Sequence, residues 1–136
     1  MRLNDLPEGC RLYGDASYRG DCPPESNEQV TFFAWLRRAH PKLADVAIHP
    51  RNEGKRHHAQ TQRHKSEGMN PGASDIIIPA SASFVCELKR RDHTKSRWQP
   101  GQEPYLEASH ALGAFTCLAL GWEAAAEAVE DWLATI

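Results

Sequence analysis

The chain has 136 residues, of which 40% are hydrophobic and 25% charged, and its formal net charge is −2. This size and composition fit one α/β domain with an ordinary core and leave no room for a second domain. Because no apolar span of about 20 residues and no basic-then-apolar leader is present, we expect a soluble protein of the bacterial cytoplasm, of bacterial or phage origin, with no membrane partner.

Residues 1–24 contain Gly, Pro, Asp and two cysteines without hydrophobic periodicity, and we expect an irregular lead-in there. From residue 25 to residue 40 the apolar side chains recur at helical spacing, and prolines bound the stretch on both sides. Glu25 heads a stripe that continues with Phe32, and Glu28 lies on a neighbouring stripe. A carboxylate at either position would serve a functional site or simply favour the helix dipole, and the pattern leaves both alternatives open.

Val46–His49 has the length and composition of a short first strand, and a basic segment follows it. Ten of the sixteen Lys and Arg residues fall in two stretches, Arg51–Lys65 and Lys89–Arg97, each with only one acidic residue. The net charge is therefore a poor guide, and this clustering predicts a basic surface for a polyanion such as nucleic acid. The alternative interpretation is a pair of solvated loops.

The segment GMNPGASDIIIPASASFVCELKRR, residues 68–91, contains two apolar runs separated by small residues, which predicts two adjacent strands. Asp75 opens the first strand, and Glu87 and Lys89 share one face of the second because side chains alternate in a strand. Carboxylate oxygens are hard ligands suited to Mg²⁺ or Mn²⁺, and a neighbouring Lys can position and help to deprotonate a water that attacks a phosphodiester. The alternative is a solvated ion pair between Glu87 and Lys89, with Asp75 a turn residue.

The last third of the chain predicts a helix, a strand and a second helix. The first helix is expected to begin near Gln102, since Pro104 is tolerated only in a first turn. Gln102 lies at the leading end of the apolar stripe of this helix, and Gln99 is the alternative. Residues 114–120 form a near-continuous apolar run typical of a strand covered on both faces, and an amphipathic helix closes the chain.

The four cysteines form no CxxC pair, so we expect reduced thiols, with Cys86 and Cys117 packed inside core strands. A zinc site made by Cys10, Cys22 and nearby histidines would match no standard spacing. Those histidines, which we expect on the surface, are His57, His58 and His64. We expect Trp98 to cover the core rather than to stack on a base.

Taken together, Gly72-x-x-Asp75, an apolar strand and Glu87-x-Lys89 resemble the VRR-NUC branch of the PD-(D/E)XK nuclease superfamily. The segment HPRNEGKR, residues 49–56, is similar to the Asn-Gly-Gly-Lys-Arg stretch of stand-alone VRR-NUC proteins. Gln102 and the later GWEA, residues 121–124, are similar to their Gln-led helix and Gly-Trp-x-x-Ala turn. The resemblance covers roughly residues 25 to 134, and Ser74 stands where that family usually has Pro.

The resemblance implies a single restriction-endonuclease-like α/β core with a central mixed sheet, in the order αβββαβα, over residues 25–136. It implies that Asp75, Glu87, the carbonyl of Leu88 and Glu25 bind Mg²⁺ or Mn²⁺. Lys89 would activate the water with the support of Gln102, and Glu28 and Gln99 remain the rivals of Glu25 and Gln102. The residues expected to contact DNA, by charge and by position in the resemblance, are Arg51, Asn52, Lys55, Arg56, Arg90, Arg91, Lys95 and Arg97.

The functional hypothesis is a divalent-metal-dependent, structure-selective DNA endonuclease that works as a homodimer and resembles Holliday-junction resolvases. One alternative is a non-catalytic nucleic-acid-binding protein that has kept the fold. The other is a sequence-specific restriction-type nuclease, for which so short a chain has little room for recognition elements.

Overall fold

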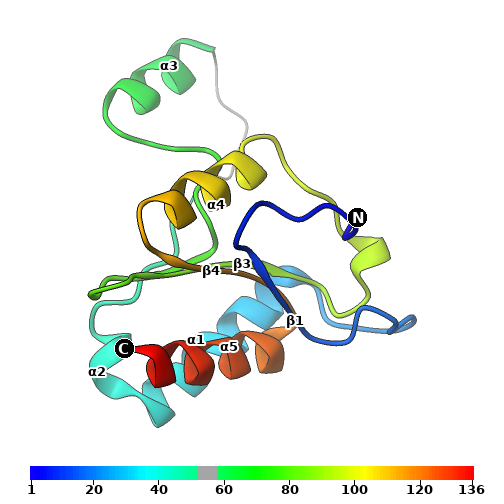
Figure 1. The fold of residues 1–136 in the computed structure, drawn as a ribbon. Helices are drawn as coiled ribbons and strands as arrows, with labels where there is room; N and C mark the ends of the chain where they lie inside the picture. Colours follow the sequence, from blue (N-terminus) through cyan, green and yellow to red (C-terminus); the bar gives the residue numbers. More distant parts are fainter. Residues whose placement is uncertain (52–57) are drawn as a thin grey trace.

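A computed structural model describes residues 1–51 and 58–136 of the protein and shows a sheet with helices on both faces (Figure 1). The strands are β1 (Arg11–Tyr13), β2 (Ile76–Ile78), β3 (Phe84–Lys89) and β4 (Phe115–Leu120). The helices are α1 (Glu25–Ala39), α2 (Pro41–Ala44), α3 (His58–Ser66), α4 (Gln102–Ala111) and α5 (Trp122–Thr135), with a 3-10 turn η1 (His93–Lys95) before α4.

The sheet is mixed, with the strand order β1-β4-β3-β2. β4 runs parallel to both β1 and β3, whereas β2 pairs antiparallel with β3. Helices α1 and α5 lie together against one face, and α4 lies on the opposite face (Figure 1). The expected α/β fold with a central mixed sheet is therefore confirmed.

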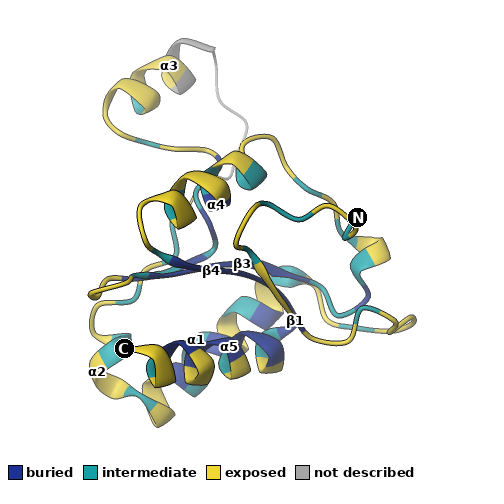
Figure 2. Cartoon of the chain, viewed as in Figure 1, coloured by how far each residue is buried: buried dark blue, intermediate teal, exposed yellow. Residues whose placement is uncertain are grey.

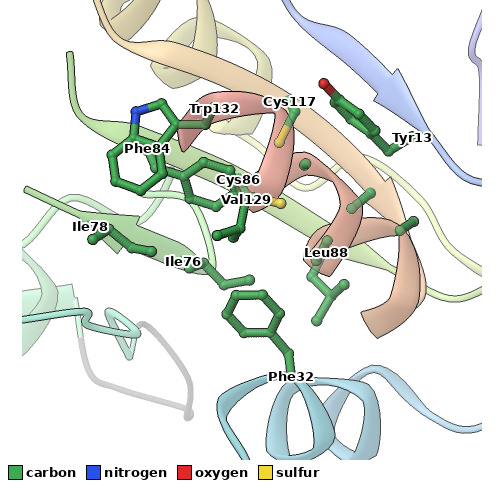
Figure 3. Packing of buried hydrophobic residues seen from close by; sticks show 14 of the residues in the cluster. Tyr13, Phe32, Ile76, Ile78, Phe84, Cys86, Leu88, Cys117, Val129 and Trp132 are labelled. Carbon is green, nitrogen blue, oxygen red and sulfur yellow. The ribbon is translucent and has the colours of Figure 1, made fainter. Parts of the chain in front are cut away.

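The hydrophobic core fills the space between the sheet and the α1–α5 layer. Alternate residues of β3 point into it, and there Phe84 packs against Trp132 of α5, with 5.3 Å between ring centroids (Figure 3). Ile76 and Ile78 of β2 and Phe32 of α1 complete this layer (Figure 3). All six residues of β3 are buried, so Glu87 and Lys89, on the face opposite the core, lie inside the molecule as well (Figure 2).

Two strands differ from the sequence-based expectation. The expected strand at Val46–His49 is reduced to one antiparallel bridge between Ile48 and Ile77, because Pro50 has no N–H with which to extend the ladder. Conversely, the expected irregular lead-in contains β1, which pairs with β4 at the edge of the sheet. A three-residue strand held by a partner about a hundred residues away leaves no periodic signal in the sequence.

The rest of the lead-in is anchored to the basic segment before α4. The guanidinium of Arg90 donates to the carbonyl oxygens of Cys22 (2.6 Å) and Pro23 (3.1 Å), and Lys95 donates to the carbonyl of Gly20 (2.8 Å). The carboxylate of Asp92 in turn accepts the backbone N–H of Gly20 at 3.0 Å. The lead-in is thus folded onto the domain by side chains of the segment from residue 90 to residue 98.

Trp98 belongs to the same set of contacts and not to the main core. Its indole N–H donates to the carbonyl of Arg2 at 3.1 Å, and the ring is half-buried. The amino group of Met1 donates to the carbonyl of His93 at 3.0 Å. The expectation that Trp98 covers the core is wrong, because the ring covers the N-terminal segment.

The substitution Asp92→Asn tests this anchorage. The Thr94 hydroxyl and the Gly20 N–H lower the pKa of Asp92 from 3.8 to about 2. Because the folded-state pKa is depressed, this stabilisation is present above pH 3.8 and is lost as the pH falls through 2. In thermal melts followed by circular dichroism, we expect Asp92→Asn to melt below the unsubstituted protein at pH 7. The two curves should converge in acid, and equal melting temperatures at pH 7 would show that Asp92 anchors nothing.

Candidate active site

The residues Asp75, Glu87 and Lys89 come together where β2 begins beside the end of β3. Ile76 is paired with Cys86, so in an antiparallel register Asp75 comes opposite Glu87. The Asp75 carboxylate accepts the backbone N–H of Leu88 at 2.8 Å, which fixes the carboxylate against β3. The structure thus brings together the three charged residues that the sequence singled out.

Gln102, the first residue of α4, links the acid and the base. Its Nε2 donates to Glu87 Oε1 at 2.7 Å, and its Oε1 accepts from Lys89 Nζ at 3.1 Å. The same oxygen accepts the backbone N–H of Gln99 at 2.8 Å. Of the two glutamines considered, Gln102 is therefore the one whose side chain lies beside Lys89, and Gln99 supports it through the backbone.

Two glycines allow α4 to approach the Asp75 loop. A Cβ at Gly72 would collide with the backbone of Gly101, which caps α4 with a φ of 89°. The loop that leads to Asp75 and the turn that leads to Gln102 therefore touch backbone to backbone. This contact is the local reason why the two side chains reach the same place.

Lys89 is fixed by several acceptors inside the protein. Its side chain is only 2% exposed, and Nζ donates to the carbonyl of Arg97 at 2.9 Å as well as to Gln102. Nζ lies 3.8 Å from Glu87 Oε1, so the ion pair is real but buried. The expected alternative of a solvated ion pair on a strand face is wrong, because α4 and the basic segment cover this face of β3.

Glu87 is the residue of the site whose charged form is disfavoured. It is 1% exposed, and burial raises its pKa well above the ordinary value; the neighbouring Asp75 carboxylate raises the pKa further, and Lys89 offsets only part of this. Its Oε2 has no hydrogen-bond partner among the residues that the structure describes. A buried carboxylate oxygen without a partner, facing a second carboxylate, is a place where a bound cation would lower the energy.

Asp75 opens onto a cleft beside the start of α1. One part of it, about 460 Å³, is lined by Glu25, Gln29, His49, Arg51, Asp75 and Leu88. An adjoining part, about 490 Å³, is lined by Glu25, His49, Pro71, Asp75, Gln99 and Gln102, among others. A ligand therefore reaches the site from the Asp75 side, and Lys89 is not among the residues that line either part of the cleft.

The two glutamates of α1 have different surroundings. Glu25 lines the cleft and accepts a hydrogen bond from the Ser96 hydroxyl at 3.1 Å. Glu28 is buried, and its carboxylate accepts the backbone N–H of Trp122 at the start of α5 and lies 3.9 Å from Arg91 Nε. Glu28 thus caps α5, where a negative charge is favourable, and Glu25 is the one that faces the site.

The donor set fits a hard divalent cation. Asp75 and Glu87 offer carboxylate oxygens, and the Leu88 carbonyl leaves β3 on the same side as the Leu88 N–H that bonds Asp75. Over residues 1–51 and 58–136, no three Asp, Glu, His or Cys side chains converge closely enough to hold a metal. Glu25 does not join Asp75 and Glu87 in such a group, so the donors that lie together are two carboxylates and one carbonyl. Mg²⁺ usually keeps several waters as its remaining ligands.

The residues expected to contact DNA fall into three groups. Arg90 and Lys95 hold the lead-in, and Arg91 pairs with Glu123 at 2.6 Å. Arg51 is exposed and lines the cleft. Arg97 is also exposed, and its backbone carbonyl accepts the hydrogen bond from Lys89. Asn52, Lys55 and Arg56 lie outside the described residues.

Of the three histidines expected on the surface, two belong to the part of the chain that the structure describes. His57 is outside the described residues, and His58 and His64 belong to α3, which projects beyond α4 (Figure 1).

All four cysteines are free, and Cys86 and Cys117 are buried at paired positions of β3 and β4, as expected. The expectation that Cys86 and Cys117 pack as core thiols is confirmed.

Sequence reasoning missed two residues that touch the site. His49 Nδ1 lies 2.7 Å from the Asp75 carbonyl oxygen, and Gln29 Nε2 donates to the same oxygen at 3.2 Å. The signal for Gln29 was present, since it lies one turn after Glu25 on the same stripe. His49 gave no separate signal, because its role depends on a bridge that forms only in three dimensions.

Comparisons with known proteins bear on the fold. One solved structure, a VRR_NUC domain protein, superposes with a TM-score of 0.68 over 85% of this chain and 91% of that one, at 20% sequence identity. No family model matches the sequence, and no curated protein matches it. The chain therefore has the fold of a VRR-NUC domain. Among the helices of the described part, none has the length and apolar character needed to span a bilayer.

The substitution Glu87→Gln tests the electrostatics of this site. Because the folded-state pKa of Glu87 is raised, its contribution to stability is present below the ordinary value of 4.5 and is lost as the pH rises through the folded-state pKa. We expect the metal-free variant to gain melting temperature relative to the unsubstituted protein as the pH rises from 4.5. Mg²⁺ or Mn²⁺ should stabilise only the unsubstituted protein, and a gap that does not change with pH would contradict this account.

Proposed function

We propose that the protein is a divalent-metal-dependent DNA endonuclease that hydrolyses phosphodiesters. The observation that carries the proposal is the set formed by Asp75, Glu87 and Lys89, which Gln102 joins at the edge of an open cleft. This set lies on a VRR-NUC fold, so the chemistry of the residues and the architecture point the same way.

In this proposal Asp75, Glu87 and the Leu88 carbonyl hold Mg²⁺ or Mn²⁺, and Glu25 faces the same cleft from α1. The bound ion would supply electrostatic stabilisation of the charge that develops on the phosphate and would lower the pKa of a water. Binding would also offset the burial of the Glu87 carboxylate and its repulsion by Asp75, which together raise the pKa of Glu87.

Lys89 orients the attacking water and helps to remove its proton. The Arg97 carbonyl and Gln102 Oε1 hold Nζ within 3.8 Å of the Glu87 carboxylate, which fixes its direction before substrate arrives. Such preorganisation is worth more in a buried site than in water, because few solvent dipoles have to reorient. Gln102 acts through Glu87 and Lys89 and is a positioning residue.

DNA is the proposed substrate, because the cations cluster in the two stretches of sequence, Arg51–Lys65 and Lys89–Arg97, that flank the site residues. Arg51 and Arg97 are exposed and accessible to a phosphate backbone. Asn52, Lys55 and Arg56 stay in the proposal as further phosphate contacts. Arg90, Arg91 and Lys95 also hold contacts within the protein, and they add to the positive local potential.

A single metal site and one small domain favour a structure-selective enzyme. Cutting two strands symmetrically requires two copies of the chain related by a two-fold axis. We therefore propose a homodimer that prefers branched DNA, such as a four-way junction. A protein with this role would act on DNA in the bacterial cytoplasm.

The proposal is tested with labelled four-way junction, flap, duplex and single-stranded DNA, incubated with Mn²⁺ or with chelator. We expect cleavage only with the metal and most rapidly on the junction.

Asp75→Asn should abolish cleavage and leave DNA binding intact, because the Asn oxygen still accepts the Leu88 N–H and phosphate affinity comes from Lys and Arg. Lys89→Met, which keeps the buried volume, should lower turnover by about 10²–10⁴-fold, the scale of general-base catalysis.

Three outcomes would contradict the proposal at different levels. Cleavage in excess chelator would overturn the metal chemistry. DNA binding without cleavage by the unsubstituted protein would favour the non-catalytic alternative. A monomer in sedimentation that nicks plain duplex as fast as the junction would leave the chemistry standing and overturn the assembly and the substrate.

A further inference from the structure

The backbone carbonyl of Asp75 lies where a β-ladder would continue but does not. Ile48 and Ile77 exchange two backbone hydrogen bonds of 2.9 and 3.0 Å on the outer edge of β2. In an antiparallel ladder such pairs recur every second residue, so the next pair would join residue 50 (48 plus 2) to residue 75 (77 minus 2). Pro50 has no N–H, and the ladder therefore offers the Asp75 carbonyl no donor.

Two side chains take the place of the missing donor. His49 Nδ1 lies 2.7 Å from the Asp75 carbonyl oxygen, and Gln29 Nε2 donates to it at 3.2 Å. Because a carbonyl only accepts, the hydrogen of the His49 contact is on Nδ1. Gln29 comes from α1 and His49 from the segment after α2, so two separate parts of the chain converge on one atom.

Asp75 is thereby held at both ends. Its carboxylate accepts the Leu88 N–H from β3, and its carbonyl is held from the opposite side by Gln29 and His49. The preceding residue adds no such restraint, since the buried Ser74 hydroxyl has no hydrogen-bond partner within the described residues. Backbone rotation at Asp75 would move the carboxylate away from Glu87, and the two donors oppose that rotation.

We propose that Gln29 and His49 are positioning residues, a two-donor clamp that sets the Asp75 carboxylate for metal binding. The inference rests on the proposed function, because it gives the clamp a metal ligand to position. Removing a side chain that hydrogen-bonds a metal ligand and orients it commonly lowers metal affinity or activity by about 10–100-fold. Both residues also line the cleft, so the clamp lies where substrate enters.

The test compares Mn²⁺ affinity, measured by calorimetry, with kcat and KM for DNA cleavage. Gln29→Met and His49→Phe remove the donors and keep the size of the side chains. His49→Asn keeps an N–H near the position of Nδ1, whereas His49→Gln displaces it by one methylene. His40→Phe is the matched control, because His40 is also half-buried and hydrogen-bonded, through Nε2 to Glu130 at 2.6 Å, and neither residue lines the cleft.

We expect Gln29→Met and His49→Phe to weaken Mn²⁺ binding and lower kcat by about 10–100-fold each, with KM for DNA unchanged. His49→Asn should restore both the Mn²⁺ affinity and kcat. His49→Gln should behave like His49→Phe, and His40→Phe should behave like the unsubstituted protein. Should His49→Phe fail to fold, the contrast between His49→Asn and His49→Gln carries the same information.

The possible results separate the clamp from the proposed function. If the unsubstituted protein binds Mn²⁺ and cuts DNA, but the clamp variants behave like His40→Phe, the clamp is overturned alone. If it binds Mn²⁺ without cutting, the proposed function fails and the Mn²⁺ affinities still decide the clamp. If it binds no Mn²⁺, both are overturned.

Discussion

The constraint on which the rest of this structure depends is a pair of opposite charges inside a strand that is buried along its whole length. Glu87 and Lys89 lie on the face of β3 that points away from the core, and both are covered. Removing two charges from water is costly, and attraction between them seldom compensates without further hydrogen bonds. Gln102 and the Arg97 carbonyl provide those bonds, so the start of α4 and the segment before it have to lie where they do. The lead-in, in turn, holds that segment in place through Arg90, Asp92 and Lys95.

The first two turns of α1 show how closely stability and the site are combined. Glu25 faces the cleft, Glu28 caps the start of α5, and Gln29 donates to the Asp75 carbonyl. Neighbouring positions of α1 thus face the candidate metal site, the start of α5 and the backbone of Asp75. A shift of α1 along its axis would disturb all three contacts, and this couples the packing of the α1–α5 layer to the geometry of Asp75.

The sequence was enough to predict the α/β fold and to single out Asp75, Glu87, Lys89 and Gln102, because strand alternation and helix phase are local properties. It was not enough where a residue's role depends on a distant partner. Arg90 and Lys95 were predicted as DNA contacts from their charge, and nothing in the sequence indicated their hydrogen bonds to carbonyls of the lead-in, some 70 residues earlier. β1 and the His49 contact also required the folded chain, since both depend on pairings between segments that are far apart in the sequence.

The central claim is that Asp75 and Glu87 together form a divalent-metal site, and crystallography with Mn²⁺ tests it most directly. Crystals of the unsubstituted protein soaked in Mn²⁺ should show an anomalous peak in contact with both carboxylates and with the Leu88 carbonyl. Glu87 Oε2, which lacks a partner among the described residues, should be one of the ligands. A peak elsewhere, or no peak at a Mn²⁺ concentration that supports cleavage, would contradict the account.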